Sequence, residues 1–179
     1  MTKRSTKKEH FSSVLEASDN KLWGAHLTVP KSIATRLIGG TQRRVVCTLN
    51  GVETFQCALI PHGNGSFVIT VNKKLRDKLD LKFGMTVNVH LQKDESKYGL
   101  PMPEEFAELL RQDKQGSRFF HALTPGKQRT LLYIIGQKKN SEARIDCGII
   151  ILEHLKANKG AVQYRKLNGA LKKSHRLGG

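Results

Sequence analysis

Hydrophobic residues follow two different spacings along the chain. Between residues 11 and 94 apolar and polar residues alternate, which predicts β-strands. From Pro103 onward apolar residues recur about every 3.6 positions, which predicts helices packed on a common core. The change falls in ESKYGLPMP, whose Gly99, Pro101 and Pro103 are typical of a linker. We therefore expect a β-rich domain at 9–95, a linker at 96–103 and a helical domain at 104–158.

The β-rich region contains an internal repeat. Residues 26–49 align without a gap on residues 68–91, at an offset of 42. Each copy predicts a strand, a short helix and a second strand, and the helices are KSIATRL, started by Pro30, and KKLRDKL, capped by Asn72. Thr28, Val29, Lys31, Leu37, Val45 and Leu49 are identical to Thr70, Val71, Lys73, Leu79, Val87 and Leu91.

Further strands are expected at 11–16 and 22–29, separated by a turn at 18–21, so that about six strands form a small barrel whose ends the two short helices close. Asn50-Gly51 predicts a two-residue hairpin turn. Pairing outward from that turn places Leu49 opposite Val52 and Cys47 opposite Thr54. The segment 61–66, PHGNGS, is expected to form a turn.

The helical region predicts a compact three-helix segment. One helix carries the apolar face of Phe106 and Leu110, a turn or short helix follows, and a helix starts at Thr124-Pro125. The last helix runs from about Ser141 to Lys156. Residues 159–179 show no apolar period, and we expect them to be a disordered basic tail.

Charge is concentrated at the two ends of the chain. The net charge is +16, and residues 1–8 together with 156–179 hold eleven Lys and Arg residues and no acid, which leaves +5 for residues 9–155. Basic tails favour a polyanionic partner. The alternative is that they only keep the protein in solution.

The cysteines and the hydropathy of the sequence indicate where in the cell the protein is expected. Cys47, Cys57 and Cys147 have no CxxC spacing, so the sequence indicates neither a disulfide framework nor a zinc site. No apolar stretch has the length of a membrane span, and the N-terminal residues lack the apolar core of a signal peptide. We expect a cytoplasmic protein.

Both regions resemble known bacterial families. Residues 11–94, with HLTVPKSIA and ALIPHGNGSFVITVNKKLRDKLDLKFGMTVNV, resemble the family called domain of unknown function 1905. Residues 104–158, with FFHALTPGKQRTLLYIIGQKKNSEARI, resemble the YdeI or OmpD-associated domain, also labelled bacteriocin protection. The first resemblance implies a double-split β-barrel like that of the AbrB and MraZ-like transcription regulators. Together they imply an α+β protein: an N-terminal double-split β-barrel with an internal pseudo-repeat, then a small α-helical domain.

No catalytic constellation is found in the sequence, so we expect no enzyme, no cofactor and no metal. His26 and His90 lie on predicted strands and are more typical of structural residues. Gly63 and Gly65 join two strands, whereas a phosphate-binding glycine loop normally opens a helix. Trp23 is expected to pack in the core rather than to stack on a ligand.

Two non-enzymatic functions remain open. The first is nucleic-acid binding, DNA or RNA, through a basic surface on the two repeats. The alternative is a protein–protein interaction module in a stress, envelope or bacteriocin-protection response, using aromatic residues of the helical region. The candidate nucleic-acid-binding residues are Lys31, Arg36, Arg43, Arg44, Lys73, Lys74, Arg76, Lys78 and Lys82. The candidate partner-binding residues are Phe119, Phe120 and Tyr133.

Overall fold

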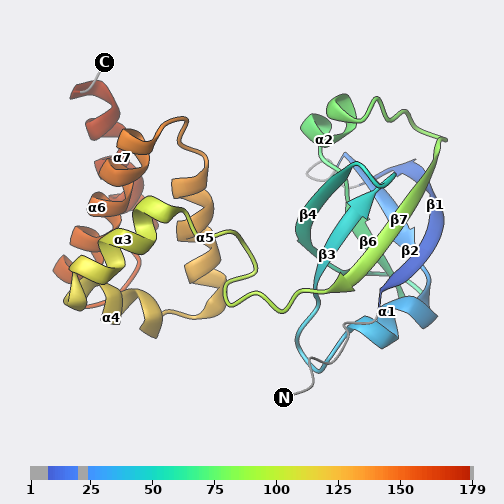
Figure 1. The fold of residues 1–179 in the computed structure, drawn as a ribbon, viewed down its shortest axis with the longest axis horizontal. Helices are drawn as coiled ribbons and strands as arrows, with labels where there is room; N and C mark the ends of the chain where they lie inside the picture. The colour runs from blue at the N-terminus through green and yellow to red at the C-terminus, as the bar shows by residue number, and fades with distance from the viewer. Residues whose placement is uncertain (1–7, 20–23, 178–179) are drawn as a thin grey trace. The chain divides into compact units, whose positions relative to one another are not determined.

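The computed structural model describes residues 8–19 and 24–177. These form two compact units, residues 1–95 and residues 96–179, referred to below as the sheet unit and the helical unit (Figure 1). The predicted change of architecture after the β-rich region is therefore confirmed. Trp23 and residues 1–7 of the basic N-terminal segment lie outside the described residues.

The sheet unit is a strongly curled antiparallel sheet (Figure 1). Its described part has seven strands in the order β4-β3-β7-β1-β2-β6-β5, where about six were expected. The additional strand is β5, which lies at the start of the predicted turn PHGNGS. The strands are β1 (Glu9–Ala17), β2 (Ala25–Val29), β3 (Arg44–Leu49), β4 (Glu53–Ala58), β5 (Ile60–His62), β6 (Ser66–Thr70) and β7 (Thr86–Lys93).

The repeat predicted from the sequence matches the elements of this sheet. The first copy contains β2, α1 (Lys31–Leu37) and β3, and the second contains β6, α2 (Lys73–Lys78) and β7. Strand β2 pairs with its equivalent β6, and β3 pairs with its equivalent β7. Leu27 faces its own counterpart Ile69, and Thr48 faces His90. The two copies are thus related by a local two-fold axis through these two residue pairs.

The two short helices lie at opposite ends of the curled sheet (Figure 1). Helix α1 buries Ile33, Ala34 and Leu37 in the core, whereas α2 has no fully buried residue. The predicted cap of α2 is confirmed, because the Oδ1 atom of Asn72 accepts a hydrogen bond of 2.8 Å from the backbone N–H of Leu75. Helix α1 therefore contributes more to the core than α2.

The hairpin at Asn50-Gly51 forms, but the predicted register is wrong. Both turn residues have positive φ, as a type I′ turn requires. Val52 is left in the turn, so that Leu49 faces Glu53 and Cys47 faces Phe55. The predicted register would have turned Phe55 away from the core. Burial of the alternating apolar side chains of β4 decides the register, because a slip of one residue exchanges the two faces of a strand.

The corrected register places Cys57 on the same face of the sheet as Cys47. Both are free thiols, and so is Cys147 in the helical unit. The hydrogen bond with Cys57 and burial raise the pKa of the Cys47 thiol well above its usual range. Burial also raises the pKa of Cys147. Cys47 and Cys147 are therefore held as neutral thiols, which are poor nucleophiles.

The described part of the helical unit contains five helices where three were expected. Its core includes Phe106, Phe120 and Leu155, all fully buried. Where a disordered tail was expected at 159–179, residues 164–177 form α7. The helices are α3 (Glu104–Gln112), α4 (Lys114–Ala122), α5 (Pro125–Gly136), α6 (Ser141–Ala157) and α7 (Tyr164–Leu177).

Candidate functional site

The nine basic residues predicted to bind nucleic acid do not form one surface. Lys31 and Arg36 lie on α1, whereas Lys73 and Lys74 lie on α2, at the opposite end of the sheet (Figure 1). The basic residues of the first repeat helix and those of the second therefore lie at opposite ends of the sheet unit.

Two of these cations are paired with acids of neighbouring strands. The Arg36 guanidinium donates two hydrogen bonds of 2.8 and 2.7 Å to the carboxylate of Glu9, which is itself 8% exposed. This pairing raises the pKa of Arg36. Lys78 lies 2.6 Å from Glu53. In both contacts the charge of the cation is neutralised within the sheet unit, so the first role of Arg36 and Lys78 is to stabilise the fold.

Arg44 and Arg76 are also committed to contacts within the sheet unit. Arg44 is half-buried and lies 3.9 Å from the buried carboxylate of Asp94. Arg76 donates a 2.7 Å hydrogen bond to the carbonyl of Val71 and lies over the ring of Phe83. The other five candidates are exposed, and within the described residues none of them forms an ion pair. They are Lys31, Arg43, Lys73, Lys74 and Lys82.

The three predicted partner-binding aromatics have different environments. Phe120 is fully buried, with its ring 5.2 Å from that of Phe106 in an edge-to-face contact. Its assignment to a partner surface is therefore corrected, since a core residue has no surface to offer. Phe119 is half-buried against Gly160. Only Tyr133 is well exposed, at 58%.

Helix α7 carries several basic side chains and no acidic one. Its sequence, YRKLNGALKKSHRL, contains no Asp or Glu. Arg165, Lys166, Lys172 and Lys173 are exposed, and within the described part of the chain none of them forms an ion pair. Residues seven apart on a helix lie on nearly the same face about 10 Å apart, so the four cations form two pairs along one side. We call these four residues the α7 cation face.

The α7 helix is fixed to the helical unit by its apolar side. Leu167 is fully buried in the core, and Leu171 packs against the same cluster. Just before α7, the backbone N–H of Gln163 donates a 3.0 Å hydrogen bond to Nε2 of His154 on α6. Burial, with a smaller effect of Lys166, lowers the pKa of His154, which favours the neutral ring that can accept this bond.

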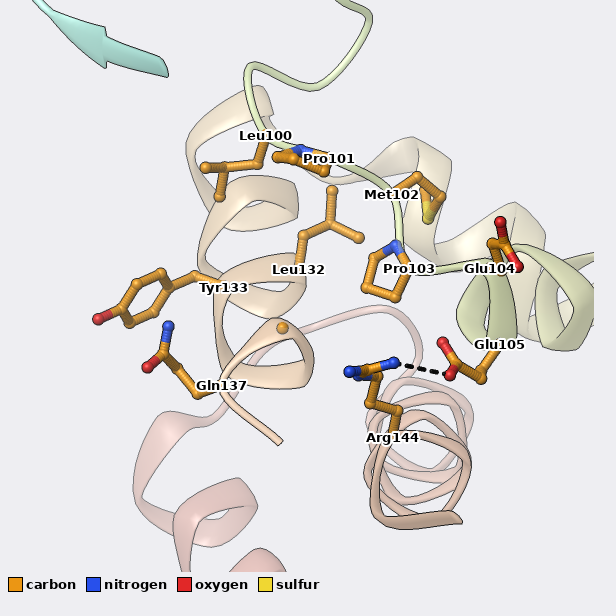
Figure 2. Close-up of a pocket in the computed structure, with 11 residues that line it drawn as sticks. Leu100, Pro101, Met102, Pro103, Glu104, Glu105, Leu132, Tyr133, Gln137 and Arg144 are labelled. Atoms are coloured by element: carbon orange, nitrogen blue, oxygen red, sulfur yellow. Dashed lines mark hydrogen bonds and ion pairs between the residues drawn. The ribbon is translucent and has the colours of Figure 1, made fainter. Parts of the chain in front are cut away.

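A concave site lies within the helical unit, between the start of α3, the end of α5 and the start of α6 (Figure 2). We call it the linker pocket, because one wall is the predicted linker. Its volume is about 550 Å³, within the range of small-molecule and peptide sites. The lining residues are Leu100, Pro101, Met102, Pro103, Glu104, Glu105, Leu132, Tyr133, Gly136, Gln137 and Arg144.

Charges in the linker pocket are partly neutralised. The Nη1 atom of Arg144 donates a 2.9 Å hydrogen bond to Oε1 of Glu105 (Figure 2). The pKa of Glu105 is lowered, first by its own backbone N–H, then by Ser141 and by Arg144. Glu104 is exposed beside this pair. The pocket therefore combines apolar walls, the ring of Tyr133 and the carboxylate of Glu104, for which the described residues provide no ion pair.

In residues 8–19 and 24–177, no group of three or more His, Cys, Asp and Glu side chains is placed to hold a metal ion. His26 is buried with Nε2 at 3.6 Å from Glu16, consistent with the structural role predicted for it. Among the described helices, none combines the length and the apolar composition needed to cross a bilayer.

Three features were missed by the sequence reasoning: α7, the linker pocket and a contact between His10 and His90. The spacing of Leu167 and Leu171, four residues apart beyond Val162, was the available signal for α7. The pocket depends on how three distant segments pack, and the sequence holds no comparable signal for it.

Comparison with protein families agrees with this two-part organisation. Residues 11–91 match the family described as Domain of unknown function (DUF1905). Residues 100–146 match the family described as Bacteriocin-protection, YdeI or OmpD-Associated. None of the curated proteins matches the chain. The family descriptions thus agree with the architecture and name no ligand.

Proposed function

We propose that this protein binds nucleic acid and that the α7 cation face is the main contact. The observation that carries the proposal is a docked helix whose exposed side has four cations and whose sequence has no acid. Folding holds these charges in place, so less conformational entropy is lost on binding than for a disordered tail. The phosphate backbone is the polyanion for which such cations are suited.

A membrane surface is a less suitable polyanion for α7. Amphipathic basic helices bind membranes by inserting their apolar side below the headgroups. The apolar side of α7 is Leu167 and Leu171, and both pack in the core of the helical unit. Insertion would require α7 to leave that core. Phosphate contact requires no such change.

The family resemblance supports this proposal in a second way. We infer that the sheet is a double-split barrel of the AbrB type, a group that includes transcription regulators. The support is that each repeat strand pairs with its own equivalent, as two copies of one unit related by a two-fold axis would. In this proposal the exposed lysines at the sheet ends add weaker contacts to those of α7.

The test compares two variants that remove the same charge. Replacing Arg165, Lys166, Lys172 and Lys173 by Gln removes the α7 cation face. Replacing Lys31, Lys73, Lys74 and Lys82 by Gln removes four exposed cations of the sheet unit. Binding to labelled duplex DNA, single-stranded DNA and RNA is measured by fluorescence anisotropy over a range of salt concentrations.

The α7 variant is expected to lose most of the affinity. For duplex DNA the slope of log Kobs against log salt should fall by about 0.9 for each phosphate that the variant no longer neutralises, or about 3 to 4 in total. The sheet variant should lose clearly less affinity. Equal losses of affinity in the two variants would contradict a specific role for α7. A loss of affinity in the sheet variant alone would mean that the repeats, and not α7, bind the nucleic acid. Equally tight binding of heparin would argue against nucleic acid as the ligand.

A second candidate function, recognition of a peptide segment, is favoured by the linker pocket. Its apolar walls, the exposed Tyr133 ring and the Glu104 carboxylate are suited to a segment with one basic and one apolar side chain, because a cation is attracted both to the carboxylate and to an aromatic face. Selection of displayed peptides on the full chain tests this. Enriched peptides should bind less tightly to Tyr133→Ala and to Glu104→Gln, and equally well to the control Tyr164→Ala. Enrichment of acidic peptides would overturn it.

A further inference from the structure

Two histidines meet on the outer face of the sheet unit. His10 on β1 and His90 on β7 are direct cross-strand partners, and their ring centroids lie 4.1 Å apart. Directly opposed side chains in an antiparallel pair have Cβ atoms about 5 Å apart. The two rings are therefore held together by the backbone register, and the contact does not depend on a flexible loop.

The ring nitrogens of this pair differ from those of His121 and His154. Within the described residues, neither ring donates or accepts a hydrogen bond, whereas His154 and His121 are engaged. The Nε2 atom of His154 accepts from Gln163 at 3.0 Å, and the Nε2 atom of His121 lies 2.9 Å from the Tyr98 hydroxyl. His10 is exposed and His90 is half-buried. Solvent and small ions can thus reach both rings.

A cavity of about 420 Å³ lies directly beside the two rings. Ser12, Asn50 and Asn88 line it with hydroxyl and amide groups, and among the described residues none of those that line it carries a carboxylate. Imidazole nitrogen is a ligand for Zn²⁺, Cu²⁺ and Ni²⁺, whereas Mg²⁺ and Ca²⁺ need several oxygen ligands, mainly carboxylates and carbonyls. The donors here match the first group.

We propose that His10 and His90 together bind one divalent late transition-metal ion. Each ring supplies one nitrogen, and the remaining coordination positions face the cavity and are filled by water or by a small exogenous ligand. Such a site links the first strand of the sheet unit to its last strand. The metal is bound by the neutral rings, because protonation removes the coordinating lone pair.

The experiment is a metal titration of the full chain, without an oligohistidine tag and after treatment with a chelator. Isothermal titration with Cu²⁺, Ni²⁺, Co²⁺ and Mg²⁺ should give one ion per chain for Cu²⁺. The affinity should decrease from Cu²⁺ to Ni²⁺ to Co²⁺, with no binding of Mg²⁺. The electron paramagnetic resonance spectrum of the Cu²⁺ form should show coupling to two imidazole nitrogens. Bound metal should also raise the Tm.

Single substitutions locate the site. His10→Ala and His90→Ala should each weaken Cu²⁺ binding at least about tenfold, since one of the two protein ligands is removed. His62→Ala is the matched control, because its ring lies 5.1 Å from that of His26 in a second histidine contact of the same unit. Unfolding without metal shows whether each variant keeps its fold. Binding abolished only in His62→Ala, or a Cu²⁺ spectrum with one nitrogen, would overturn the proposal.

Discussion

The sheet unit and the α7 helix both carry many cations, but they use them differently. In the sheet unit, Arg36 is bound by Glu9 and Lys78 by Glu53, so acids on neighbouring strands cancel the charge. On α7 the exposed side has no acid, and its cations stay available. Counting charges along a sequence therefore overestimates the binding surface of one region and underestimates that of the other. Four predictions test this comparison and the packing that maintains it.

The largest expected effect concerns the core that supports α7. Phe120→Ala should destabilise the helical unit by about 3 to 5 kcal/mol, since a fully buried aromatic ring is removed. Hydrogen exchange should show the destabilisation in residues 104–157 and not in the strands. The control Tyr133→Ala, at an exposed position, should change stability by no more than about 0.5 kcal/mol. Similar values for the two variants would mean that Phe120 is not a core residue.

The docking of α7 can be broken separately. Leu167→Ala removes its fully buried anchor and should cost about 2 to 3 kcal/mol, near the lower end of the range for Leu→Ala because a terminal helix can shift to fill space. Amide exchange in residues 164–173 should rise before that of α6. Lys166→Ala, on the exposed side of the same helix, is the control and should leave exchange unchanged. Unaltered protection in Leu167→Ala would contradict the docked position.

The paired and unpaired arginines give a direct comparison. Arg36→Ala removes the two hydrogen bonds of the guanidinium to the buried Glu9 carboxylate and should lower the free energy of unfolding measurably. Arg165→Ala should cost almost nothing, because its guanidinium forms no ion pair among the described residues. Urea unfolding of the two variants measures the difference. If both cost the same, the distinction between structural and available cations fails.

The smallest expected effect is a pH dependence of α7. The pKa of His154 is lowered from its usual value of 6.5, chiefly by burial, so the neutral ring is favoured in the folded state. Its stabilising effect is fully present above pH 6.5 and is lost as the pH falls through the lower folded-state pKa. The protection factors of Gln163 and of the first turn of α7, corrected for the intrinsic pH dependence of amide exchange, should therefore decrease in mild acid. His154→Gln should abolish this pH dependence, and a persistent dependence would point to another group.

Sequence reasoning succeeded where the determinants are local. Asn72 caps α2 and Asn50-Gly51 forms a turn because their own backbone and side-chain chemistry require no distant partner. The register of β4 was mispredicted because it depends on which side chains the rest of the sheet buries. Phe120 and Tyr133 look alike in an apolar run, and only the packing of α4 and α5 separates a core ring from an exposed one. Among the residues of α7 whose side chains are described, Leu167 and Leu171 pack in the core of the helical unit, and two leucines are a weak signal in the sequence.

The position of β1 has a consequence for synthesis of the protein. This first strand lies between β2 and β7, and Glu9 pairs with Leu91. During translation β1 therefore cannot pair with β7 until nearly the whole sheet unit has been synthesised. Until then its edge toward β7 has no partner, and an unpaired strand edge is open to wrong contacts. In the helical unit, α3 and α4 pack mainly on α6, which follows them after a shorter stretch of chain than the one between β1 and β7. The strand made first in the sheet unit therefore stays without its neighbour for longer than the helices that begin the helical unit.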